Sequence, residues 1–129
     1  MPVVSSLSAA PLRKTPALHK TRYGVHQELT DRLNQAIDLY YLGILAEARG
    51  SFKEAEDLYR KSLLIRGNEE DDRNTADLLL LLGRLLIKQH NNKAEGCFMI
   101  TKAVELYAQM NLPDEQMARD IALQLGCME

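Results

Sequence analysis

Two cysteines and three histidines are the residues of this sequence best suited to metal binding or redox chemistry. They are Cys97, Cys127, His19, His26 and His90. No CxxC pair links the cysteines, and the spacing between cysteines and histidines is not that of a zinc site. We therefore expect no bound metal or other cofactor. Both cysteines should be reduced structural thiols in a reducing compartment.

Acidic side chains form two clusters in the middle of the sequence. Glu54, Glu56 and Asp57 have the spacing of paired carboxylates, but acids at the start of a helix also stabilise it through the helix dipole. The run from Glu69 to Asp72 is typical of a solvated linker. Because no Ser/His/Asp set, Cys/His set or glycine-rich phosphate loop accompanies these acids, we expect no catalytic site and no enzymatic activity.

The composition favours a helical protein that binds no nucleic acid and does not span a membrane. Hydrophobic residues make up 46% of the chain and aromatic residues only 5%, which suits Leu- and Ala-rich helices better than β-strands. The formal charge is +4 over residues 1–27 and −6 over residues 28–129, and no Lys/Arg cluster offers a phosphate-binding surface. Apolar runs are shorter than the roughly 18 residues that a transmembrane helix requires.

Residues 1–27 contain three of the four prolines and lack a sustained helical period. We expect a flexible, basic N-terminal segment there, ahead of a helical domain at residues 28–129. The segment also has the Arg, Lys and Ser content of a mitochondrial transit peptide, although its prolines do not suit the amphipathic helix of such peptides. We therefore expect a cytoplasmic protein, with the mitochondrion as the alternative if this segment is a transit peptide.

Apolar residues recur every three or four positions from Glu28 onward, which predicts consecutive helices. The first helix should start near Thr30 or Asp31 and end at Gly50. A capping box at 51–54 opens the second helix. The third carries leucines on nearly every face, so it should be buried on more than one side. The last three helices should cover about residues 75–89, 93–110 and 114–125, with Asn92 and Glu95 capping the fourth helix of the chain.

A Leu-Gly pair occurs three times in this region, at Leu42-Gly43, Leu82-Gly83 and Leu125-Gly126, with spacings of 40 and 43 residues. A glycine inside a helix costs about 1 kcal/mol relative to alanine. Its recurrence therefore indicates that a neighbouring helix approaches closely at this position. The sequence thus contains two helix pairs and a final half-unit.

Further residues recur with the Leu-Gly pair. Each first helix carries apolar or small residues around it, and each second helix carries a small residue, a large one and another small one. The positions are Leu39, Leu42-Gly43, Ala46, Gly50, Ala55, Tyr59 and Ser62-Leu63 in the first unit, and Leu79, Leu82-Gly83, Leu86, Gly96, Ile100 and Ala103-Val104 in the second. On these residues the chain resembles the tetratricopeptide repeat family. The units of this chain are longer than the roughly 34 residues usual in that family. They are similar to the longer, 40–43-residue variant of kinesin-light-chain-like repeats.

The resemblance implies an all-α fold in which antiparallel helical hairpins stack as a short right-handed superhelical array. Repeat 1 would cover residues 30–68 and repeat 2 residues 74–111. Residues 114–126 would form a half-repeat or capping helix.

The resemblance also implies a concave groove lined by the first helices. The groove residues would be Ile37, Tyr40, Ile44, Glu47, Leu80, Arg84, Ile87 and Lys88. Because this surface is largely apolar with a basic edge, we expect a protein-protein interaction module, an adaptor, scaffold or assembly factor. Its groove would bind an amphipathic helix or a hydrophobic peptide of another protein. A carboxylate clamp is not expected, since apolar residues occupy the places of the Lys and Asn that form it in chaperone-tail-binding members.

Two alternatives remain open. The fifth helix, or Leu12 and Leu18 of the N-terminal segment, would fill the groove from within the chain. Alternatively, two and a half repeats are fewer than the roughly three that make such an array stable alone. In that case the chain would be a self-associating structural unit whose open end or groove is buried in a homodimer.

Overall fold

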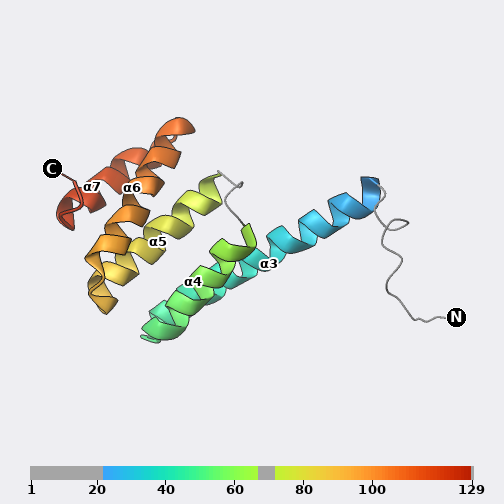
Figure 1. The fold of residues 1–129 in the computed structure, drawn as a ribbon, viewed down its shortest axis with the longest axis horizontal. Helices are drawn as coiled ribbons and strands as arrows, with labels where there is room; N and C mark the ends of the chain where they lie inside the picture. Colours follow the sequence, from blue (N-terminus) through green and yellow to red (C-terminus); the bar gives the residue numbers. More distant parts are fainter. Residues whose placement is uncertain (1–21, 67–71, 129) are drawn as a thin grey trace, which may run out of the picture. The chain divides into compact units, whose positions relative to one another are not determined.

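The computed structural model describes residues 22–66 and 72–128, and over these residues the chain is helical and has no β-strand. Residues 1–32 and 33–129 form two compact units, and the packing described below belongs to the second. The described helices are α3 (Arg22–Ala48), α4 (Phe52–Arg66), α5 (Arg73–His90), α6 (Lys93–Gln109) and α7 (Asp114–Gln124) (Figure 1). The predicted all-α class is therefore confirmed, while the flexible segment expected before Arg22 lies outside the described residues.

Helix α3 begins earlier than the sequence pattern predicted. It starts at Arg22, whereas a cap was expected at Thr30 or Asp31. No proline lies between Pro16 and the predicted start, so the sequence contains no residue there that would interrupt a helix. Residues 22–27 therefore belong to a helix and not to the predicted flexible segment.

The caps of α5 and α6 are polar side chains that accept hydrogen bonds from the first helical turn. The Asp72 carboxylate accepts from the backbone N–H of Thr75 at 2.9 Å. The Asn92 side-chain oxygen accepts from the backbone N–H of Glu95 at 3.3 Å, and its amide donates to the Glu95 carboxylate. The reciprocal cap predicted at the start of α6 is thus confirmed.

Helix α5 is the centre of the core. It packs against α4 and α6, and α6 packs against α7 (Figure 1). Leucines on several faces of α5 are buried, as predicted from its all-round apolar sequence. They are Leu78, Leu79, Leu80, Leu82, Leu85 and Leu86. In the part of the chain that the structure describes, no helix is both long and apolar enough to cross a membrane.

Glycines allow the helices to approach closely, as their recurrence predicted. A Cβ atom at Gly43 would lie 2.5 Å from the Tyr59 ring of α4. A Cβ atom at Gly83 would lie 2.7 Å from both the backbone oxygen of Gly96 and the side chain of Ile100, in α6. Gly126 has a different role, because its positive φ of 79° places it in the turn that follows α7.

Replacing Gly83 with Ala should lower the free energy of unfolding by about 1–3 kcal/mol, although alanine favours a helix by about 1 kcal/mol. The added methyl group would meet the backbone of Gly96, which cannot rotate away, so α5 and α6 would have to separate. Urea denaturation followed by circular dichroism measures the change. An increase in stability would contradict the close approach of these two helices.

Cys97 and Cys127 form a disulfide, with their Cα atoms 5.1 Å apart. The expectation of two reduced thiols is therefore wrong. The physical reason is that the chain after α7 returns to α6, which a spacing of 30 residues in the sequence does not reveal. Because disulfides persist mainly in oxidising surroundings, this bond gives no support to the expected reducing compartment.

Candidate interaction surface

The predicted groove residues of α3 are only partly accessible. Ile37, Tyr40, Ile44 and Glu47 are all half-buried, and Tyr40 and Ile44 pack against the hydrophobic core. The Glu47 carboxylate accepts a hydrogen bond of 2.8 Å from the Tyr59 hydroxyl of α4. Burial raises the pKa of Tyr59 and the bond to Glu47 raises it further, so the phenol stays protonated and holds the carboxylate in place.

The predicted groove residues of α5 divide into buried and accessible ones. Leu80 is only 5% exposed, so the prediction that it lines an accessible groove is wrong. The Ile87 side chain fills the space beside Gly96 of α6. Arg84 is half-buried and Lys88 is exposed. Because α5 packs on helices from both sides, little of its apolar surface is left for a partner.

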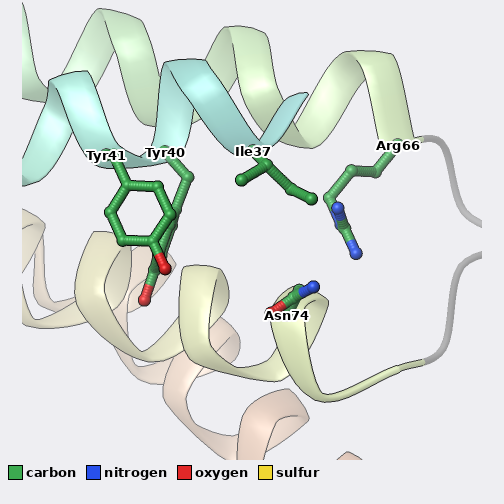
Figure 2. A pocket seen from close by; sticks show the side chains of 5 residues that line it. All are labelled: Ile37, Tyr40, Tyr41, Arg66 and Asn74. Carbon is green, nitrogen blue, oxygen red and sulfur yellow. The ribbon is translucent and has the colours of Figure 1, made fainter. Parts of the chain in front are cut away.

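A pocket of about 100 Å³ lies between α3, the end of α4 and the start of α5, lined by Ile37, Tyr40, Tyr41, Arg66 and Asn74 (Figure 2). Figure 2 shows the two tyrosines at one end of the pocket and Arg66 with Asn74 at the other. The pocket is smaller than the roughly 300 Å³ of a small-molecule site. It has room for a single side chain and not for a helix.

The outer surface of α3 carries three exposed apolar side chains in its second half. Tyr41 is 58% exposed, Leu42 49% and Leu45 55%. We refer to these three residues as the exposed α3 face. The Tyr41 ring packs edge-on against the ring of Tyr40, with ring centres 5.2 Å apart.

In the second unit, the residues forty positions later in the sequence correspond to this face, and they are buried. Leu82 is fully buried and Leu85 is 1% exposed, whereas Leu42 and Leu45 are half accessible. Leu42 therefore shares the repeated motif with Leu82 but not its burial. In the second unit α4 precedes and packs on α5, but α3 is the first helix in the described part of the chain.

The acidic residues have basic neighbours. Glu54 contacts Arg49, Asp57 contacts Lys53, and Glu56 contacts Arg60. These contacts agree with the structural role expected for the first acidic cluster. In the second cluster Asp72 caps α5, and the other three acids lie outside the described residues.

His90 contacts an acidic residue of α4. It is the last residue of α5, is half-buried, and its Nδ1 atom lies 2.9 Å from the carboxylate of Glu56. Among the residues that the structure describes, no group of His, Cys, Asp and Glu has the arrangement of a metal site.

The described residues define an all-α protein in which consecutive helices pack against one another. No protein-family model, curated protein or solved structure matches the chain.

Proposed function

We propose that this chain is a protein-protein interaction module built from tetratricopeptide-like hairpins, and that its exposed α3 face receives an amphipathic helix. The observation that carries the proposal is the contrast between Leu42 and Leu45, which are accessible, and Leu82 and Leu85, which are buried at the same places in the second unit. A surface that is covered by a helix in one repeat and open in the other is suited to bind a helix.

The internal contacts support the repeat on which this comparison depends. In the first unit Gly43 of the first helix faces Tyr59 of the second, and in the second unit Gly83 faces Ile100. Both pairs are those aligned from the sequence, with one extra residue in the second turn. The same glycine-to-large-residue contact thus closes each hairpin.

The geometry of α5 supports a helix as the ligand. At about 100° per residue, Leu82 and Leu85 lie roughly 100° and 160° round the helix from Gly83, in the same direction. Gly83 faces α6, and α4 is the other described helix that packs on α5, so we infer that α4 covers these leucines. Leu42 and Leu45 have the same relation to Gly43, and a helix resembling α4 would therefore cover them.

The predicted groove is a second candidate binding site, with a more restricted choice of ligand. Arg84 and Lys88 make no hydrogen bond or salt bridge with the described residues, and they are one helical turn apart on α5. Together with Tyr40 they would favour an acidic segment over the apolar peptide first expected. Binding at either place involves no catalytic step and no cofactor.

A labelled peptide with the sequence of α4, residues 52–66, is the probe that tests the proposal. We expect its fluorescence anisotropy to rise with protein concentration and to saturate, with a dissociation constant between about 10 µM and 1 mM because an isolated 15-residue helix is marginally stable. Leu42→Glu should weaken binding at least about tenfold, since it places a charge in an apolar contact.

The matched control is Leu64→Glu, which changes a leucine of α4 that is 83% exposed and should leave peptide binding unchanged. The double variant Arg84→Glu, Lys88→Glu distinguishes the groove from the exposed α3 face. Loss of binding in this variant alone would move the site to the groove. No saturable binding by the wild-type chain would contradict the proposal.

A further inference from the structure

We infer that the helix received by the exposed α3 face is α3 of a second copy of this chain, so that two copies pair antiparallel about a two-fold axis. The inference rests on the proposed function, because it names the ligand of the same face. A two-fold pairing requires a surface that is complementary to itself, and α3 has such a surface.

The spacing of residues along α3 fits a helix pair. Asp38, Leu42, Leu45 and Arg49 follow one another at intervals of four, three and four residues. This is the interval of the contact positions of a coiled coil. The first three residues lie in α3, and Arg49 directly follows its last residue with its backbone N–H still bonded to the Leu45 oxygen, so all four lie on one side. All four are exposed, so no other described helix covers this line.

The order of these residues is symmetric when one helix is reversed. In an antiparallel pair centred between Gly43 and Ile44, Leu42 of each copy lies opposite Leu45 of the other. In the same register Asp38 of each copy lies opposite Arg49 of the other. One register therefore satisfies the apolar contacts and the charged contacts together.

The charges select the antiparallel direction. Asp38 makes no hydrogen bond or salt bridge with the described residues. Arg49 contacts Glu54 at 3.2 Å, but both side chains are more than half exposed, so this pair contributes little and leaves the guanidinium accessible. A parallel pair in register would place each charge opposite its own copy, which is unfavourable.

Tyr41 borders this line and adds apolar area. It lies one helical turn before Leu45 and packs edge-on against Tyr40. Aromatic side chains lose little entropy when they are buried in an interface. The two copies of Tyr41 would flank the central leucines.

Sedimentation equilibrium of the full-length chain tests the inference. Over concentrations from about 1 µM to about 1 mM, the mass should rise from the 14.6 kDa of one chain to twice that value. Leu45→Glu should raise the dimer dissociation constant at least about tenfold, whereas Leu64→Glu should leave it unchanged. Circular dichroism of each variant verifies that the helices are retained.

A charge exchange tests the register. Asp38→Arg and Arg49→Asp should each weaken the dimer by about three- to tenfold, because like charges then face each other at two places. The double variant Asp38→Arg, Arg49→Asp should restore most of the affinity. A gain in the double variant over both single variants is expected only if residues 38 and 49 of different copies meet.

Three results would overturn the inference: a monomer at every concentration, a dimer insensitive to Leu45→Glu, or no recovery in the charge-exchanged double variant. A chain that stays monomeric but binds the α4 peptide through Leu42 would retain the proposed function and require a different protein as ligand. A chain that stays monomeric and binds no peptide would contradict both.

Discussion

Replacing Leu82 with Ala should lower the free energy of unfolding by about 2–5 kcal/mol, whereas the same change at Leu42 should cost less than about 1 kcal/mol. Leu82 is fully buried in α5, so shortening it removes apolar contacts and leaves a cavity. Leu42 is 49% exposed, and truncation there leaves no enclosed space.

The two leucines occupy the same position of the repeated motif, which makes each the control for the other. Urea denaturation should be followed at a protein concentration at which the chain is monomeric, so that self-association does not stabilise the folded state. Equal losses at both positions would contradict the difference in burial on which the exposed α3 face depends.

Replacing Asp72 with Ala should lower the free energy of unfolding by about 1–3 kcal/mol, because the buried Arg66 loses its charged partner, although the Asp72 side chain itself is 47% exposed. The Arg66 guanidinium donates to both Asp72 oxygens, at 2.8 and 2.9 Å, and to the Thr75 hydroxyl at 3.0 Å. Arg66 is only 4% exposed, so loss of the carboxylate leaves its charge largely desolvated.

Two further variants separate the roles of Asp72. Asp72→Asn keeps an acceptor for the Thr75 backbone N–H, so it should be about 1 kcal/mol more stable than Asp72→Ala. Combining Arg66→Met with Asp72→Asn removes both charges and should recover most of the lost stability. A loss below about 1 kcal/mol for Asp72→Ala would show that the pair does not connect the end of α4 to the start of α5.

The same carboxylate makes stability depend on pH. Partial burial by itself raises the pKa of Asp72, but hydrogen bonds from Thr75 and Arg66 outweigh this effect and lower the pKa below its ordinary value. The stabilisation is therefore complete above the unfolded value of about 3.9 and is lost as the pH falls through the folded value. The free energy of unfolding should decrease below about pH 4, and less steeply in Asp72→Asn.

Positions and types of the helices were determined by the sequence, because both depend on interactions between residues close in the chain. The apolar period and the caps located α4 to α7 to within about two residues. Glycines at positions 43 and 83 indicated close helix contacts, since a glycine inside a helix is unfavourable unless a neighbour requires the space. The all-round apolar pattern of α5 likewise predicted its burial on more than one side.

Exposure was decided only by the tertiary structure. Leu42 and Leu82 have the same local motif, yet one is accessible and the other is buried; among the described helices, α5 has a preceding helix, α4, packed on it, and α3 is the first. Leu80 was expected to line a groove and lies in the core.

The pairing of Cys97 with Cys127 was also beyond the sequence, because it depends on where the chain runs after α7. A local pattern determines which residues share a face of a helix. Which element covers that face depends on contacts between residues that are distant in the chain, and no short segment contains that information.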